Sequence, residues 1–146
     1  MTIQRSTLVW IYGLVAVHAL IGTWGNNIHY MTSGLSPLDV NILFWKETLA
    51  NPASRSITVD ILFLSIAVMV WMMMEARRLK MRGIWFYLVG SVLIAVSMTV
   101  PLFMALRERK LAATQPEAGT LSVAEIIWAL ALSGVVIAYT VRTLTF

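Results

Sequence analysis

Four long apolar runs dominate this sequence and constrain its fold more than any other feature. An α-helix rises about 1.5 Å per residue, so roughly 20 apolar residues cross the roughly 30 Å hydrocarbon core of a bilayer. Apolar residues make up 59% of the chain and charged residues 12%, whereas soluble globular proteins carry about 45–50% and about 25%. The sequence therefore predicts an all-α fold, an integral membrane bundle of four transmembrane helices that forms a single membrane domain over residues 1–146. The spans are expected at about 8–24, 56–76, 84–106 and 122–141.

A short additional helix is expected at about 37–50, between the first two spans. Ser36 can accept a hydrogen bond at the helix start, Pro37 suits the first helical position, and Asp39 complements the helix dipole. The segment is too short to cross a bilayer, and its apolar residues recur on one face. We therefore predict an interfacial helix, which either lies in the membrane surface or folds back against the bundle.

Basic residues flank the apolar runs, and this pattern sets the expected partners and orientation. The net charge of +4 comes from clusters beside the spans, so these residues are interpreted as anchors to the lipid bilayer, and no nucleic-acid partner is predicted. Four crossings would place the N-terminus, the basic loop at 77–82 and the C-terminus on one side. The positive-inside rule then predicts cytoplasmic termini.

The sequence offers few groups for metal or cofactor chemistry. It contains no cysteine and two histidines, so it can form neither a disulfide nor a thiolate metal site. It also lacks a phosphate-binding loop and a dinucleotide-binding motif. The motifs of zinc proteases and serine hydrolases are absent as well. No metal site and no cofactor are predicted, and the ligand expected is a lipid or carotenoid-like molecule.

Polar residues gather on one face of the second span, where Asp60, Trp71 and Glu75 lie within about 60° of one another at about 100° per residue. A carboxylate at membrane depth costs roughly 2–4 kcal/mol and often marks function. Asp60 and Glu75 are therefore candidate catalytic residues, and Trp71 is a candidate ligand contact. The structural alternative pairs Asp60 with Arg55 near headgroup level and Glu75 with Arg78 at i+3. The two carboxylates are about 22 Å apart along the helix, so neither can complete an acid–base pair with the other.

The third span carries two further candidates for ligand binding, Tyr87 and Ser97, on one stripe with Pro101. Proline removes the N–H that would bond the Ser97 carbonyl, so a kink and a free acceptor are expected there. This stripe either lines a polar pocket or permits close packing between helices.

The first span and the segment after it carry the remaining ligand-binding candidates. His18 lies within the span, where a neutral imidazole needs a partner from another helix. The span is expected to end near Trp24, which leaves Asn27 and His29 in a surface loop. These residues either cap a ligand cavity or serve as packing residues and interfacial anchors.

Several short motifs occur together in the middle of the chain. They are Asn51-Pro52-Ala53-Ser54-Arg55 with Asp60, Glu75-Ala76-Arg77-Arg78-Leu79 with Trp71, Trp85 and Tyr87, and Pro101-Leu102-Phe103 with Arg107-Glu108-Arg109. In this combination the segment from about Phe44 to Leu111 resembles the DUF2834 family of small bacterial multi-span membrane proteins. The resemblance implies a membrane fold located in a bacterial cytoplasmic (inner) membrane. It implies no catalytic residues, because the family has no assigned function.

Three functions are compatible with these features. We expect first a lipophilic-ligand-binding protein or an accessory subunit of a larger membrane complex, with other membrane proteins or a second copy of the chain as partners. The alternative is a membrane-embedded cyclase or isomerase that acts on an isoprenoid or carotenoid. In that case Asp60 is the acid, since an apolar site favours a neutral carboxyl group. The architecture is similar to that of small membrane proteins of carotenoid and terpenoid metabolism. The third function is a small transporter or channel formed by an oligomer.

Overall fold

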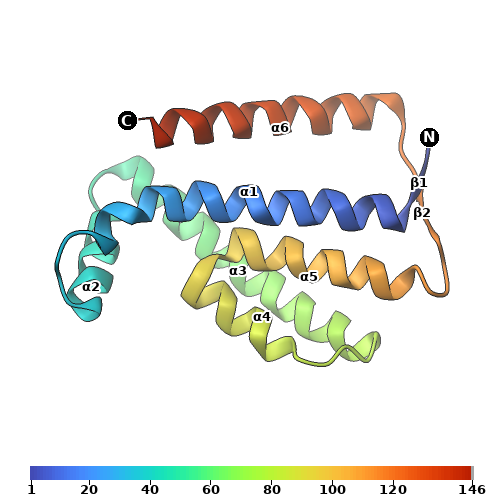
Figure 1. Ribbon diagram of the computed structural model, residues 1–146, viewed down its shortest axis with the longest axis horizontal. Coiled ribbons are helices and arrows are strands. Elements are labelled where there is room, and N and C mark those ends of the chain that lie inside the picture. The colour runs from blue at the N-terminus through green and yellow to red at the C-terminus, as the bar shows by residue number, and fades with distance from the viewer. Residues whose placement is uncertain (146) are drawn as a thin grey trace.

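The computed structural model describes residues 1–145, whose helices form an all-α membrane bundle (Figure 1). Four segments are long and apolar enough to cross a membrane: α1 (Arg5–Met31), α3 (Pro52–Arg78), the segment Ile84–Leu111 and α6 (Val123–Leu144). Most of their apolar surface is exposed, as expected where lipid surrounds the helices. The predicted all-α bundle with four apolar helical segments is confirmed.

The helix α1 continues past the point where the sequence predicted its end. Residues 25–29 are helical, so the predicted surface loop does not form there. Asn26 Nδ2 donates to the Gly22 carbonyl at 2.7 Å and to Thr143 Oγ1 of α6 at 3.3 Å. These contacts stabilise helix geometry at a stretch of glycine and asparagine that would by itself favour a helix end.

The short helix α2 (Pro37–Glu47) lies across one end of the bundle (Figure 1). Ser36 Oγ accepts a hydrogen bond from the Asp39 N–H at 3.2 Å, the cap that the sequence predicted. Asn51 then caps α3, because its Oδ1 accepts from the Ser54 N–H at 2.9 Å. None of the α2 residues is buried. This placement agrees with a helix at the membrane surface.

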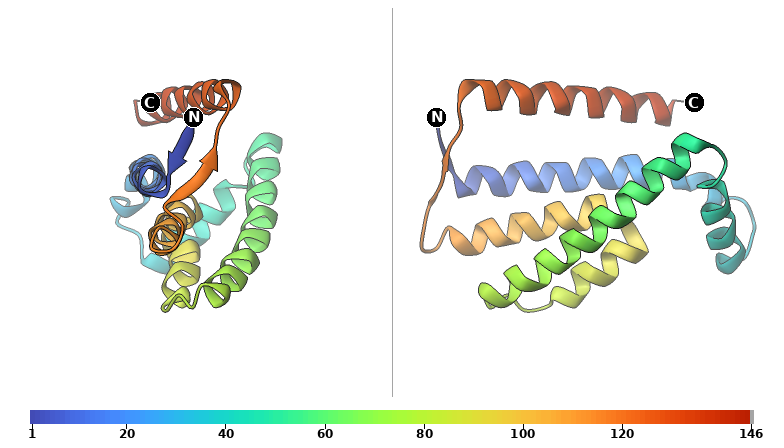
Figure 2. Two further views of the ribbon diagram at one scale, coloured as in Figure 1. Left: turned by 90° about the vertical axis from the view of Figure 1, so that its right-hand side faces the viewer. Right: turned by 180° about the vertical axis from the view of Figure 1, so that it is seen from behind.

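The third apolar segment reverses direction and forms a helical hairpin (Figure 2). It consists of α4 (Ile84–Gly90), the short π-helix η1 (Ser91–Ala95) and α5 (Val96–Leu111). Ala95 is extended, with φ −170° and ψ 129°, and the chain turns back at this residue. The chain therefore does not follow the single kinked path predicted for 84–106, and Pro101 lies within α5, after the reversal.

Contacts between the two arms of the hairpin establish the reversal. Ser91 Oγ and Thr99 Oγ1 are 2.5 Å apart, and the ring centroids of Tyr87 and Phe103 are 5.5 Å apart. In one continuous helix, residues 16 positions apart would be separated by about 24 Å. The hairpin thus enters and leaves the bundle at the same end.

The reversal changes which parts of the chain share a side. Lys110 Nζ donates to the Lys80 carbonyl at 2.8 Å, so the charged segments at the two feet of the hairpin lie together. The antiparallel strands β1 (Thr2–Gln4) and β2 (Glu117–Thr120) pair at this same end. The N- and C-termini consequently lie at opposite ends of the bundle (Figure 1). The prediction that both termini share one side is wrong.

Basic residues are concentrated at the end of the bundle that carries the N-terminus. Of the 11 lysines and arginines, eight lie at the start of α1, at the end of α3 and in the turn after it, or near the end of α5, segments that ion pairs and hydrogen bonds join at this end: Arg5, Arg77, Arg78, Lys80, Arg82, Arg107, Arg109 and Lys110. The other three, Lys46, Arg55 and Arg142, lie toward the end that carries α2 and the C-terminus. Four straight spans would instead have divided the basic residues almost evenly, so the hairpin creates a strong charge asymmetry.

The longest helix contact is between α1 and α5, and a small buried cluster lies between α3 and the hairpin. Met72, Ala76 and Phe103 form the buried cluster there, and the rings of Trp71 and Tyr87 pack edge-on against Phe103 at centroid distances of 5.7 and 5.5 Å. By contrast, α6 buries none of the residues along its described length. The hairpin is therefore packed along α1 and against the buried cluster on α3, and α6 lies at the margin of the bundle.

Candidate functional site

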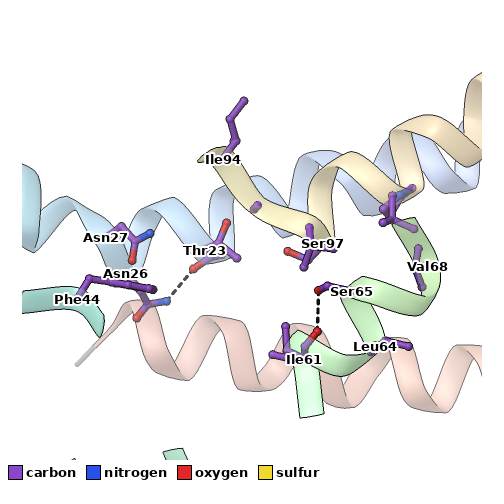
Figure 3. A pocket seen from close by; sticks show the side chains of 15 residues that line it. Thr23, Asn26, Asn27, Phe44, Ile61, Leu64, Ser65, Val68, Ile94 and Ser97 are labelled. Atoms are coloured by element: carbon purple, nitrogen blue, oxygen red, sulfur yellow. Dashed lines mark hydrogen bonds between the residues drawn. The ribbon is translucent and has the colours of Figure 1, made fainter. Parts of the chain in front are cut away.

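A cavity lies beyond the tip of the hairpin. The 16 residues of α5 rise about 24 Å and the 27 residues of α1 about 40 Å. The hairpin therefore stops short of the full length of the bundle. The space beyond its tip is an open-sided cavity of about 710 Å³ between α1, α3 and the tip, with Phe44 of α2 at its edge (Figure 3). Several of its lining side chains, such as Leu64 and Ile61, remain partly exposed.

The cavity wall is apolar on α3 and at the tip of the hairpin, and it carries amide and hydroxyl groups at a few positions. Its apolar residues include Ile61, Leu64, Val68, Ile94 and Val100. Its polar residues are Thr23, Asn26, Asn27, Ser65 and Ser97. No acidic or basic residue and no histidine is among the described residues that line it. The site can therefore offer hydrogen bonds, and it provides no counter-ion.

Most of these polar groups already have a partner within their own helix. Thr23 Oγ1 donates to the Ala19 carbonyl at 2.8 Å, and Ser65 Oγ donates to the Ile61 carbonyl at 2.6 Å. The side chains of Asn27 and Ser97 form no hydrogen bond within residues 1–145. These two groups are thus available to a molecule that enters the cavity.

Trp24 holds the tip of the hairpin against α1. Its indole Nε1 donates to the Ile94 carbonyl at 3.2 Å. A carbonyl freed by the break in the helix would be costly to leave without a partner in an apolar environment. Trp24 was predicted as a ligand contact. In the structure it supports the tip of the hairpin and is not part of the cavity lining.

Buried ion pairs form a second polar cluster at the opposite end of the hairpin. The carboxylate of Glu108 accepts hydrogen bonds from Arg5 and Arg107. The carboxylate of Glu75 accepts from Arg78 at 2.5 Å and from Arg107 Nε at 2.6 Å. The side chains of Glu75 and Glu108 are 8% and 4% exposed, so each carboxylate depends on its arginines for compensation. We refer to these five residues as the ionic cluster.

The ionic cluster joins three parts of the chain that are distant in sequence. Arg5 begins α1, Glu75 and Arg78 end α3, and Arg107 and Glu108 lie near the end of α5. Each carboxylate has two guanidinium partners. Both carboxylates are paired, so neither is free to act in proton transfer. The ionic cluster therefore has a structural role and holds the ends of α1, α3 and α5 together.

The two predicted catalytic carboxylates occupy separate environments. Asp60 is exposed on α3, does not line the cavity, and forms no hydrogen bond or ion pair within the described residues. Arg55, its predicted partner, instead donates to the Leu49 carbonyl at 2.9 Å. Glu75 belongs to the ionic cluster, and its pairing with Arg78 confirms the structural alternative for that residue.

The other predicted ligand contacts are distributed over the bundle. His18 lies on α1 with its Nδ1 at 2.8 Å from the Leu14 carbonyl, and His29 packs edge-on against Tyr30. Trp71 and Tyr87 pack on the buried core. None of these four lines the cavity, whereas Asn27 and Ser97 do. Their role in binding a ligand stays a prediction.

Sequence reasoning missed several residues at both polar sites. Thr23, Asn26 and Ser65 were not singled out for the cavity, and Arg5 and Glu108 were not singled out for the ionic cluster. Glu108 offered a signal, because an acid between two arginines at the end of an apolar run often needs a partner from another helix. The path of the hairpin, which brings Arg5 to that acid, had no comparable signal.

A metal site is not evident in the described part of the chain. Within residues 1–145, no three histidine, aspartate or glutamate side chains converge as metal ligands.

Comparison with known proteins identifies the family. No curated protein and no solved structure matches the chain. The family described as "Protein of unknown function DUF2834" matches residues 11–109, which is about two thirds of the chain. The match extends further toward the N-terminus than the likeness seen in the sequence, and it includes every residue that lines the cavity. This chain therefore belongs to the DUF2834 family.

Proposed function

We propose that this small polytopic membrane protein binds a lipophilic ligand in the cavity beyond the hairpin tip. The observation that carries the proposal is the cavity itself, about 710 Å³ with a largely apolar wall. Sites for small ligands typically measure about 300–1,000 Å³ and are lined mainly by apolar groups with a few polar ones. A cavity of this kind between helices that cross a membrane is accessible to molecules dissolved in lipid.

The cavity gives less support to the other functions. The isomerase or cyclase hypothesis needs an acid at the substrate, and Asp60 does not line the cavity. The accessory-subunit hypothesis is supported by the exposed apolar surface of α6, which offers area to another membrane protein. Ligand binding and a role in a larger complex are compatible with each other, so the proposal keeps both.

Filling the cavity tests this function. We expect Leu64→Trp to reduce ligand occupancy at least about tenfold, which corresponds to about 1.4 kcal/mol of binding free energy, because the indole would occupy the space beside α3. Leu62→Trp is the matched control, since Leu62 lies on the same helix, is exposed, and does not line the cavity. The measurement is native mass spectrometry of protein extracted from its membrane directly into nanodiscs, with retained lipophilic molecules counted per chain. Equal retention in the wild type and both variants would contradict the proposal.

We further infer the orientation of the chain in a bacterial cytoplasmic membrane. The end that carries the N-terminus holds eight of the 11 basic residues, and the positive-inside rule assigns such an end to the cytoplasm. The C-terminus and α2 then lie on the opposite face, and the cavity lies in the half of the bilayer nearer to that face.

Single cysteines can test this orientation, because the natural chain has none. We expect a membrane-impermeant maleimide to label Thr145→Cys in spheroplasts and to label Thr114→Cys only after the membrane is permeabilised. Both positions are exposed, and they lie at opposite ends of the bundle (Figure 1). Labelling of Thr114→Cys alone would reverse the orientation, and labelling of both would show that the termini share a side.

A further inference from the structure

The charge of the cavity wall limits the kind of ligand that can enter it. The described residues that line the cavity include no aspartate, glutamate, lysine, arginine or histidine. A charged group placed among them would lose its hydration and gain no counter-ion, which is strongly unfavourable in an apolar environment. The ionic cluster cannot supply that counter-ion, because it lies at the other end of the hairpin and its carboxylates are already paired. The part of a ligand held in the cavity is therefore uncharged.

The polar groups of the cavity are not evenly distributed. Figure 3 shows Thr23, Asn26 and Asn27 of α1 toward one side and Leu64 and Val68 of α3 toward the other. Thr23 and Asn26 already have partners in the protein, so a pure hydrocarbon would leave the Asn27 amide as the unsatisfied side chain on the α1 side. A molecule with one polar end and a long apolar part would match both sides.

The hairpin reversal explains why the Ser97 hydroxyl is free. Three serines within the apolar helices donate back to the carbonyl four residues earlier: Ser65 to Ile61, Ser91 to Tyr87 and Ser133 to Ala129. The equivalent carbonyl for Ser97 belongs to Leu93, which precedes the extended residue Ala95. The chain direction changes between them, so this local bond does not form. The hydroxyl remains in the cavity wall with its hydrogen-bonding capacity unused.

Asn27 differs in the same way from its neighbour on α1. The Asn26 amide donates to the Gly22 carbonyl and to Thr143 of α6. The Asn27 amide lines the cavity and has no hydrogen bond within residues 1–145. Two unused groups, an amide and a hydroxyl, thus come from α1 and from the tip of the hairpin. They lie at separate places on the cavity wall (Figure 3), and either one can exchange a hydrogen bond with an oxygen-bearing group of a ligand.

From these observations we propose that the ligand is an uncharged amphiphile. Its hydroxyl or carbonyl group is held by one of the two unused groups, Asn27 or Ser97, and its apolar chain lies along the wall formed by Ile61, Leu64 and Val68. This inference rests on the proposed function and adds the chemical class of the ligand. It also assigns separate parts of the cavity wall to the polar and apolar parts of that ligand.

The test uses four probes with the same chain and different polar ends: hexadecan-1-ol, hexadecane, hexadecanoate and hexadecyltrimethylammonium. Binding to the full chain in nanodiscs is measured by native mass spectrometry and compared with empty nanodiscs, so that partition into lipid is subtracted. We expect hexadecan-1-ol to bind at least about tenfold more tightly than the other three probes. Preferential binding of either charged probe would overturn the inference.

Substitutions then locate the polar contact. The variant that removes the holding group, Asn27→Leu or Ser97→Ala, is expected to lower hexadecan-1-ol binding about to the level of hexadecane and to leave hexadecane binding unchanged, because it removes only a hydrogen-bonding group. Ser133→Ala, the same change on α6 outside the cavity, should leave all four probes unaffected. Unchanged hexadecan-1-ol binding in both cavity variants would show that these residues do not hold the polar end.

The outcomes separate this inference from the proposed function. Equal binding of hexadecan-1-ol and hexadecane, abolished for both by Leu64→Trp, would retain a lipophilic site and overturn its assigned preference for a polar end. Binding of no probe above the level of empty nanodiscs would count against both proposals.

Discussion

Replacing Glu108 by alanine is expected to lower the free energy of unfolding by roughly 3–5 kcal/mol, the range observed when one partner of a buried ion pair is removed. The Glu108 side chain is 4% exposed and accepts from two guanidinium groups, those of Arg5 and Arg107. Its loss leaves Arg5 with the Gln115 carbonyl as its hydrogen-bond acceptor and leaves Arg107 with Glu75. Arg5, Arg107 and Glu108 connect the start of α1 to the hairpin. We therefore expect this end of the bundle to open first.

The measurement is reversible unfolding in mixed detergent micelles, followed by circular dichroism. Glu117→Ala is the matched control, because Glu117 is exposed on β2 and has no hydrogen bond or ion pair from its side chain within the described residues. It should change stability by less than about 0.5 kcal/mol. The double variant Arg5→Ala/Glu108→Ala should be more stable than the sum of the single effects predicts, since it removes both members of one pair. A destabilisation by Glu108→Ala no larger than that of Glu117→Ala would contradict the role assigned to the ionic cluster.

The second large effect is an all-or-none cross-link across the hairpin. We expect Ser91→Cys/Thr99→Cys to form an intramolecular disulfide almost completely under mild oxidation, because the two native side-chain oxygens are 2.5 Å apart. Disulfides require Cα atoms within about 7 Å of each other. Residues eight positions apart in a continuous helix are about 12 Å apart along the axis. The cross-link therefore distinguishes the hairpin from a single span.

The lack of native cysteine makes the result unambiguous. Disulfide formation is measured by mass spectrometry as loss of thiol alkylation that reduction restores. The pair Val92→Cys/Val100→Cys has the same separation in sequence and serves as control. Val92 is 74% exposed, whereas Val100 packs against the buried cluster, so we expect no disulfide there. Alkylation of both thiols in the Ser91/Thr99 pair after oxidation would favour the single kinked span.

The helix starts were predictable because their determinants are local. Ser36 caps α2, and Ser122 and Glu125 form a reciprocal capping box at the start of α6. Each cap joins a side chain to a backbone group three residues away, so spacing alone predicts it. The apolar runs were predictable for a related reason. A helix in lipid satisfies its backbone hydrogen bonds within the same segment.

The hairpin could not be predicted from the same signals. Residues 84–106 are apolar without interruption at Ala95, and the expected distortion was placed at Pro101, where a proline removes a backbone donor. The break instead occurs at an alanine that has no intrinsic preference for it. Its stabilising contacts, from Trp24 to Ile94 and between Ser91 and Thr99, join residues that come together only in the folded chain.

The candidate site was likewise predictable only in part. Asn27 and Ser97 were predicted as ligand contacts from their polarity, and both line the cavity, although Asn27 was expected in a loop and lies in a helix. Asp60 was predicted from the cost of a carboxylate at depth, and it lies outside the cavity. Polarity indicates that a residue needs a partner. It does not indicate which other helix will supply that partner.

The sequence by itself determined the membrane fold, the apolar helical segments and the caps that begin α2 and α6, because each depends on hydropathy or on hydrogen bonds within a few residues. The tertiary structure alone decided the path of Ile84–Leu111. That path places the termini at opposite ends, brings eight basic residues to one end, assembles the ionic cluster and leaves the cavity beyond the hairpin tip. All of these depend on contacts between residues distant in sequence, whose energies no local pattern contains.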